Sequence, residues 1–360
     1  MIRNRKGMTL IVALLILALM AGCASAPAPE ETAAPSPEGT LAPVVETTSP
    51  EPEPTKEPED VIDDTLQVAT LKGPTGMGMV KLMQDYEEGL TENAYSFSIA
   101  GAPDEVTGKL ITGEVDIAAL PVNLAATLYN KTEGEIVMIA VNTLGVLYVL
   151  EQGDTVQSIK DLEGKTVYAT GQGATPEYIL NYLLDKNGIK DQVTVEYKAE
   201  HAELATLLGA GEVTLGMLPE PNVTATLLKN SDLRIALDLT EEWNKVSEGT
   251  PLVQGCIVAR KEVVLDRPDQ IATFLREYEE STYYAIAEME EAAKLIEKYE
   301  IMGSAAAAQK AIPNCNIVCI SGESMSYAAS GMIEMLFEAD EKSVGGKMPG
   351  NDFYHVLNAG

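Results

Sequence analysis

The chain has 360 residues, of which 46% are hydrophobic, so it carries enough apolar side chains to form substantial cores. Asp and Glu number 55 against 25 Lys and Arg, and the formal net charge at pH 7 is −30. This excess of negative charge argues against a partner with a phosphate backbone, such as nucleic acid, and against docking on anionic lipid headgroups.

Residues 1–22 are predicted to be an export signal. Three basic residues in the first six positions precede a 13-residue apolar run, 8–20, which is too short to span a bilayer. Small residues then precede Cys23, and this pattern resembles the bacterial lipoprotein cleavage site. The resemblance implies that Cys23 is diacylated, becomes the mature N-terminus and anchors the protein to the extracytoplasmic face of the cell membrane. A plain signal peptide and an uncleaved anchor remain alternatives.

Residues 23–65 are mainly Pro, Glu, Thr, Ser and Ala, with few large apolar side chains. Such a segment cannot bury a core, and proline together with like charges stiffens it. We therefore predict a disordered, acidic, Pro-rich tether between the anchor and the folded part.

Two stretches of the folded part repeat each other at a shift of 98 residues. In each copy a helix is predicted to end at a glycine, an apolar strand follows, and a proline stops the strand and opens another helix. The matching strands are 115–120 and 213–218. The aligned glycines and prolines are Gly113 with Gly211 and Pro121 with Pro219.

Each copy is preceded by another strand, a glycine-containing loop and a helix, which predicts two β-α-β-α-β-α lobes in tandem. Apolar strands that alternate with helices are typical of parallel sheets covered on both faces. The β-rich stretches 144–150 and 252–259 are predicted to cross between the lobes. Lobe 1 would then comprise residues 66–148 and 252–360, and lobe 2 would comprise residues 149–251.

The C-terminal part is predicted to be helical over 269–299, 304–311 and 321–338, as a cover on lobe 1. Two of its cysteines, Cys315 and Cys319, lie four residues apart and either form a disulfide outside the cell or stay as buried thiols. Two His and no Cys-x-x-Cys pair argue against a zinc site. No metal and no cofactor are predicted.

Ligands of open α/β sheets bind beyond the carboxyl ends of the strands, beside helix N-termini. In this chain the rule selects three loops from each lobe. They are 72–77, 101–104 and 121–123 in lobe 1, and 170–175, 200–201 and 219–221 in lobe 2.

Three features of these loops favour ligand binding. Glycines such as Gly73 and Gly171 let backbone N–H groups approach a ligand closely. Thr175 precedes a proline and is predicted to be an N-cap, and facing helix N-termini favour a small anion. Thr75 and Thr175 could equally serve as helix caps alone.

Glu220, between two prolines at a strand end, could accept a hydrogen bond from a ligand amine, or it could be a solvent-facing acid of a helix first turn. Tyr148, Tyr178 and Trp243 are candidate stacking faces, or packing residues. The sequence shows no Ser-His-Asp arrangement and no paired carboxylates with catalytic spacing, so no catalytic residue is predicted.

The lipoprotein-like start, acidic tether, duplicated lobes and two crossings together resemble ABC-transporter solute-binding lipoproteins. Residues 71–78, 170–178 and 217–221 are similar to the nitrate/sulfonate/taurine and thiamine-precursor branch of that group. The resemblance extends over residues 66–360. It implies a type II periplasmic-binding fold: an α/β protein with two doubly wound lobes joined by two crossing strands, with C-terminal helices on lobe 1.

The same resemblance implies a monomer without catalytic activity that captures a solute between its lobes and hands it to a membrane permease. A sulfonate, nitrate and a thiamine-pyrimidine-like ring all remain open as the solute. A ligand sensor for a membrane receptor is an alternative, and so is an enzyme, because other type II folds catalyse dehydration in quinone synthesis. The predicted ligand-binding residues are Lys72, Gly73, Thr75, Gly76, Met77, Pro121, Asn123, Gly171, Gln172, Thr175 and Glu220.

Overall fold

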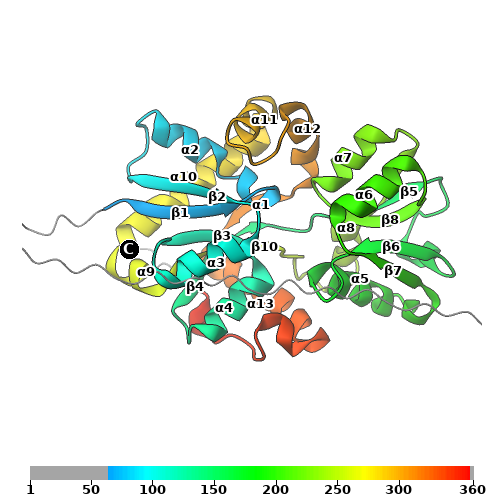
Figure 1. The fold of residues 1–360 in the computed structure, drawn as a ribbon. Helices are drawn as coiled ribbons and strands as arrows, with labels where there is room; N and C mark the ends of the chain where they lie inside the picture. The colour runs from blue at the N-terminus through cyan, green and yellow to red at the C-terminus, as the bar shows by residue number, and fades with distance from the viewer. Residues whose placement is uncertain (1–63, 357–360) are drawn as a thin grey trace, which may run out of the picture. The chain divides into compact units, whose positions relative to one another are not determined.

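A computed structural model describes residues 64–356, which contain two β-sheets flanked by helices (Figure 1). The predicted export signal, Cys23 and nearly all of the predicted tether lie outside the described residues. We call the part built on the first sheet lobe 1 and the part built on the second sheet lobe 2. Within residues 64–356, every helix is too short or too polar to span a bilayer.

The sheet of lobe 1 has six strands in the order β11-β4-β10-β3-β1-β2. β1 pairs in parallel with β2 and β3, whereas β10 runs antiparallel between β3 and β4, and β11 runs antiparallel to β4. The strands are β1 (Leu66–Leu71), β2 (Tyr95–Ala100), β3 (Ile117–Pro121), β4 (Ile136–Thr143), β10 (Gly255–Arg260) and β11 (Ile317–Ile320).

The sheet of lobe 2 has five strands in the order β7-β6-β8-β5-β9. β6 pairs in parallel with β7 and β8, and β5 lies antiparallel between β8 and β9. The strands are β5 (Leu147–Gln152), β6 (Thr166–Thr170), β7 (Thr194–Lys198), β8 (Leu215–Pro219) and β9 (Leu233–Asp238).

The repeat predicted from the sequence is confirmed. Helices α3 and α6 both end at a glycine in the left-handed region, Gly113 at φ 81° and Gly211 at φ 73°. Strands β3 and β8 follow, each ends at its proline, and a helix begins within three residues. The helices are α3 (Pro103–Thr112), α4 (Val122–Lys131), α6 (His201–Ala210) and α7 (Asn222–Lys229).

The fold class is also confirmed, but the sheets are mixed and not wholly parallel. The chain leaves β4 in lobe 1 and enters lobe 2 as β5, and it returns after β9 to form β10 in lobe 1. β5 and β10 are the strands that the chain forms on passing from one lobe to the other. Each runs opposite to the strands of the βα units and so pairs antiparallel with its neighbours.

The remaining helices cover the two sheets. In lobe 1, α10, α13 and the last 3₁₀ turn pack on its strands, as predicted for the C-terminal part. Lobe 1 carries α1 (Pro74–Met77), α2 (Val80–Glu87), α9 (Lys261–Asp266), α10 (Pro268–Ala287), α11 (Met289–Lys298), α12 (Ala305–Ala311) and α13 (Gly322–Ala339), with 3₁₀ turns η3 (Ile312–Asn314), η4 (Glu341–Val344) and η5 (Asn351–Phe353). Lobe 2 carries α5 (Thr175–Lys186) and α8 (Leu239–Asn244), with η1 (Ile159–Leu162) and η2 (Lys190–Gln192).

Two details of this C-terminal part differ from the sequence prediction. The single run 269–299 is two helices, because the backbone leaves the helical region at Glu288, which has φ −114° and ψ 51°. The four-residue strand β11 was missed, although its sequence Ile-Val-Cys-Ile is rich in β-formers. Its apolar run is too short to be told from a loop by periodicity alone.

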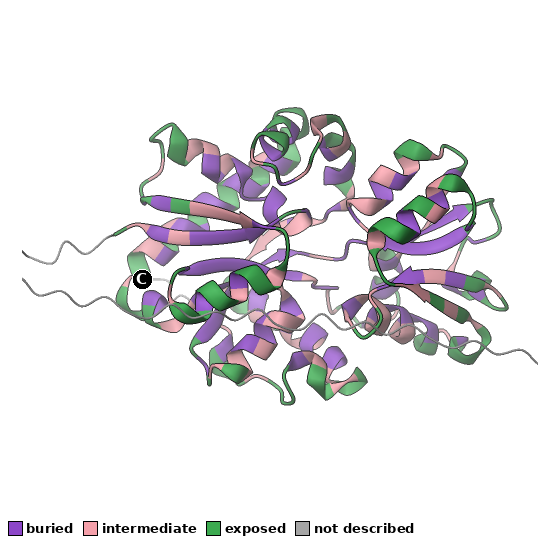
Figure 2. Ribbon diagram, viewed as in Figure 1, coloured by how far each residue is buried: buried purple, intermediate pink, exposed green. Residues whose placement is uncertain are grey.

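The central strands of both sheets are buried along almost their whole length, whereas the outer faces of the helices are exposed (Figure 2). All eight residues of β4 are buried. Helix α10 contributes Phe274, which is fully buried and packs near the rings of Tyr95 and Tyr278. Tyr283 on the same helix is 74% exposed.

Replacing Phe274 with Ala should lower the free energy of unfolding by about 3–5 kcal/mol, because the lost ring leaves a cavity among rigid neighbours. Tyr283→Ala on the same helix is the matched control and should change it by no more than about 0.5 kcal/mol. Urea unfolding followed by circular dichroism measures both. Equal effects of the two changes would show that α10 does not pack as described.

Candidate functional site

The loops at the carboxyl ends of both sheets line two cavities with volumes of about 890 and 520 Å³. Both cavities have walls from lobe 1 and lobe 2, and they share Pro74 and His201. We call them the large cavity and the small cavity. All six loops selected from the sequence contribute residues to one or both.

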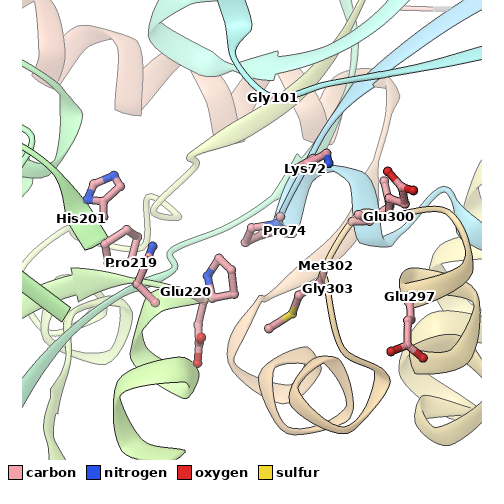
Figure 3. A pocket seen from close by; sticks show the side chains of 14 residues that line it. Lys72, Pro74, Gly101, His201, Pro219, Glu220, Glu297, Glu300, Met302 and Gly303 are labelled. Carbon is pink, nitrogen blue, oxygen red and sulfur yellow. The ribbon is translucent and has the colours of Figure 1, made fainter. Parts of the chain in front are cut away.

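The large cavity is the more highly charged of the two. Figure 3 shows His201, Pro219 and Glu220 from lobe 2 on one side and Lys72, Glu297 and Glu300 from lobe 1 on the other. The remaining lining residues are Gly73, Pro74, Gly101, Pro221, Asn222, Ile301, Met302 and Gly303.

The small cavity borders the two segments that cross between the lobes. Thr143 is the last residue of β4, Val146 belongs to the first crossing, and Gln254 belongs to the second. The side chain of Gln254 ties the two together, because its Oε1 accepts a hydrogen bond from the Val146 N–H at 2.6 Å. The other lining residues are Pro74, Thr75, Pro103, Asp104, Pro121, Asn123, Leu124, Ala174, Thr175, Pro176 and His201.

Besides the single-turn α1, four longer helices have first-turn residues in the wall of the small cavity: α3, α4, α5 and α6. A helix N-terminus carries unpaired N–H groups and partial positive charge, so it favours an anion or a carbonyl oxygen. Among the described residues lining this cavity the only acid is Asp104, and none is Lys or Arg. Donors to a solute would therefore come from backbone N–H groups, hydroxyls and amides.

His201, the first residue of α6, lines both cavities. Its Nδ1 lies 2.6 Å from the hydroxyl of Thr170, which is buried at the end of β6. Burial lowers the pKa of His201 below its usual value of 6.5 despite the nearby Glu200, so the imidazole is neutral at pH 7. Since Nδ1 already has a partner, Nε2 is the ring nitrogen left for a solute.

Glu220 follows β8 and is only 2% exposed. Its carboxylate accepts hydrogen bonds from the N–H of Thr224 at 3.1 Å, the hydroxyl of Thr224 at 2.9 Å and the side-chain amide of Asn314 at 3.0 Å. Burial raises the pKa of Glu220, and these three donors oppose the rise. The solvent-facing alternative is therefore wrong, and the acceptor capacity predicted for a ligand is largely used by the protein.

Seven of the eleven predicted ligand-binding residues line a cavity. They are Lys72, Gly73 and Glu220 at the large cavity, and Thr75, Pro121, Asn123 and Thr175 at the small cavity.

The other four predicted residues line neither cavity. Met77 is fully buried in an apolar cluster with Val80. A Cβ on Gly76 would lie 2.2 Å from the carbonyl oxygen of Leu71, so only glycine fits at this position. Gly171, at φ 79°, packs on a proline ring, and Gln172 is exposed.

Thr175 is not the predicted N-cap. Ala174 occupies that position, and no side chain caps the helix, so Thr175 is the first helical residue. The candidate stacking residues line neither cavity. The ring of Trp243 packs against the ring of Tyr182, and Tyr148 is buried on β5. Tyr178 donates a hydrogen bond to Asp340 at 3.1 Å.

Several lining residues lie outside the loops selected from the sequence, among them Gln254 and members of the segment 297–303. Gln254 is polar within an apolar crossing stretch, and that contrast could have identified it. Residues 297–303 come from the end of α11 and the loop after it, and no local signal links them to the strand-end loops.

The cysteines of this region are free thiols: Cys315 is buried and Cys319 is partly buried. Of the two alternatives for this pair, the structure has thiols and not a disulfide. Among residues 64–356, no three His, Cys, Asp or Glu side chains are grouped so that they could hold a metal ion.

Comparison with known proteins gives one family and many similar structures. The model of a family described as menaquinone biosynthesis matches residues 79–312. In the comparison with curated protein sequences, nothing matches the chain.

Three solved structures illustrate the structural similarity. An ABC transporter protein from Parabacteroides distasonis is 24% identical, with a TM-score of 0.71, over 82% of this chain and 100% of that one. The periplasmic aliphatic sulphonate-binding protein SsuA from Escherichia coli is 16% identical, with a TM-score of 0.63, over 82% of this chain and 94% of SsuA. The alkanesulfonate-binding SsuA from Xanthomonas axonopodis, bound to MOPS, is 14% identical, with a TM-score of 0.55, over 82% and 96%. At these identities the likeness establishes the type II periplasmic-binding fold.

The lowered pKa of His201 predicts how stability depends on pH. The unfolded chain binds this proton near pH 6.5, but the folded chain binds it only at lower pH, so the free energy of unfolding should fall as the pH decreases below about 6.5. His201→Asn should remove this part of the decrease. Glu220 contributes in the opposite direction and His355 in the same direction, and both contributions stay in both proteins. Urea unfolding from pH 8 to pH 5 measures the difference, and NMR titration of the two histidines measures the pKa directly. A His201 pKa at or above 6.5 would contradict the prediction.

Proposed function

The chain belongs to the family described as menaquinone biosynthesis, and we propose that within it this protein captures a small solute as the binding component of an ABC importer. The observation that carries the proposal is the meeting of strand-end loops from both lobes around two adjoining cavities, the smaller of which borders the crossing segments. The SsuA structures, whose names describe sulfonate binding, share its fold.

The proposed solute is a small organic or oxyanionic compound of nitrogen or sulfur: a sulfonate, nitrate or a thiamine-pyrimidine-like ring. Four helix N-termini at the small cavity suit an anionic or carbonyl group. The proline, leucine and valine side chains of the same wall suit an apolar or flat remainder. Asn123, Thr75, Thr175 and His201 would supply hydrogen bonds, and Lys72 would face the solute from the large cavity.

The proposed mechanism is hinge closure about the two crossing segments. For this step we propose the bounds 66–148 and 252–360 for lobe 1 and 149–251 for lobe 2. Strand β5 spans the first of these bounds and is counted with lobe 2, whose sheet contains it. A solute bound to the loops of one lobe gains the contacts of the other only when the lobes close, so it selects the closed state. Gln254 lines the small cavity and bonds to the first crossing, so it links the solute to the hinge.

The cellular setting is part of the proposal. A lipid on Cys23 and the acidic tether would hold the monomer at the extracytoplasmic face of the membrane, beside a permease that receives the solute. A sensor would bind in the same way but signal to a membrane receptor.

A second candidate function is catalysis, which the family's description favours. The neutral imidazole of His201, oriented by Thr170, is a group that could accept a proton from a bound substrate. We favour binding without conversion because the other acid or base buried at the site, Glu220, is already bonded to three protein donors.

A thermal-shift screen of the full chain with taurine, longer alkanesulfonates, nitrate and aminopyrimidines should identify a compound that raises the melting temperature, because it binds only the folded state. For that compound, Asn123→Ala should raise the Kd about 5- to 150-fold, equivalent to about 1–3 kcal/mol for a lost hydrogen bond. Asn187→Ala removes a half-buried amide at the C-cap of α5 and serves as the matched control for calorimetry. Equal affinity of both variants would remove Asn123 from the site.

Binding and catalysis are separated by what happens to the bound compound. The protein is incubated with the compound overnight and denatured, and the released material is analysed by mass spectrometry. A binding protein returns the compound unchanged. A product that forms with the wild type but not with His201→Asn would establish the enzyme instead.

A further inference from the structure

A short segment of lobe 1 reaches across to lobe 2 and forms a non-covalent connection beside the two crossings. It comprises residues 312–316, between α12 and β11, and we call it the strap. Ile312 and Cys315 anchor it in a buried apolar cluster of lobe 1 that also contains Met77. Directly after it, Ile317 pairs with Thr143 of β4.

Asn314 is the strap residue that contacts lobe 2. Its side-chain amide donates to Glu220 Oε1 at 3.0 Å, and its backbone carbonyl accepts from the hydroxyl of Tyr148 at 2.8 Å. Both partners are almost fully buried, Glu220 at the end of β8 and Tyr148 on β5. Asn314 lines neither cavity, so its contacts serve the protein and not a solute directly.

Asn316 binds the strap to the first crossing. Its backbone carbonyl accepts from the N–H of Leu144 at 3.0 Å, and its side-chain amide donates to the carbonyl of Gly145 at 2.5 Å. Its φ of 43° lies in the left-handed region, which Asn tolerates better than most residues. The strap is therefore hydrogen-bonded to the first crossing through Asn316 and to lobe 2 through Asn314.

Helix α12 connects the strap to a loop that lines the large cavity. The loop before α12 contributes Met302 and Gly303 to the cavity wall, and the carbonyl of Ile301 accepts from the N–H of Gly73 at 3.1 Å. Helix α12 contacts α7, the helix that follows Glu220 (Figure 1). Glu220 itself lines the large cavity, so the Glu220–Asn314 bond connects this part of the cavity wall to the strap.

We propose that Asn314 is a positioning residue: through Glu220 it holds the two lobes at the separation that the cavities require, without touching the solute. The proposal rests on the proposed function only where it concerns solute affinity. The lobe separation itself is a property of the solute-free protein.

The physical reason is the cost of burying a carboxylate that lacks a donor. In Asn314→Ala the backbone carbonyl still accepts from Tyr148, but Glu220 loses its one donor from lobe 1 and keeps only those of Thr224. A buried charged group that loses a hydrogen bond is strongly destabilised, and water can replace the lost donor if the lobes separate. The variant should therefore favour a more open arrangement.

Two other titratable groups face Glu220, Tyr148 from β5 and Cys315 from the strap. Burial raises the pKa of both, so both stay neutral between pH 5 and pH 8. A carboxylate placed at position 314 would therefore titrate against Glu220 alone. Two facing carboxylates repel when both are ionised and form a hydrogen bond when they share a proton.

The test measures the distance between spin labels on the two lobes of the full chain, by pulsed electron resonance without any solute. The labels are attached through Ile111→Cys on α3 and Leu228→Cys on α7, both exposed positions, with Cys23→Ser and Cys319→Ser to avoid other labels. Asn314→Ala should shift the mean distance upward by more than the width of the wild-type distribution. Asn314→Asp should give the longer distance at pH 8 and return to the wild-type distance at pH 5.

Tyr178→Phe is the matched control, because it also removes a bond between the lobes, to Asp340, but at a half-buried position where water replaces the partner. It should leave the distance unchanged. A wild-type distance for Asn314→Ala would overturn the proposal. If circular dichroism shows that Asn314→Ala is unfolded, Asn314→Asp decides, and a distance independent of pH would overturn it. Since no solute is used, failure to find one would count against the importer and not against this role.

Discussion

The site depends on where the central strands of the two sheets stop. β3 and β8 are buried along almost their entire length, and each ends at a proline, Pro121 or Pro219. A proline has no N–H to extend the ladder, and its fixed φ suits the start of a helix. The strand end, the helix N-terminus and the cavity wall therefore coincide in both lobes. The remaining strand-end loops are aligned with these two because parallel strands share a carboxyl edge.

Strands β5 and β10 place the two crossing segments beside the carboxyl edges of both sheets. β5 and β10 enter their sheets directly from the crossing segments, so each crossing lies at the carboxyl edge of the parallel strands in the lobe that it joins. This is why Thr143, Val146 and Gln254 can line the same small cavity as Asn123 and Thr175. The crossings, about which we propose that the lobes close, are thereby part of the surface that a solute would touch.

Much of this architecture could be predicted because its signals are local. A helix that ends at Gly113, an apolar strand and Pro121 follow one another within 20 residues, and their repetition at Gly211 and Pro219 identifies two similar lobes. The strand-end rule then selects loops that all contribute residues to the two cavities. Within a loop, however, the sequence does not say which side chain faces the cavity. Met77 faces the core and Gly76 serves close packing, although both belong to a loop that the rule selected.

What the sequence could not indicate is a contact between distant segments that no pattern links. Glu220 and Asn314 are 94 residues apart, and neither flanking sequence distinguishes a buried, bonded carboxylate from an exposed acid. The surrounding residues decide the matter: they leave Glu220 only 2% exposed, so its charge needs protein donors. If the lobes separated, Glu220 would lose the amide of Asn314 and water would have to take its place. The interface between the lobes therefore contains a polar group whose partners are complete only in the arrangement described here.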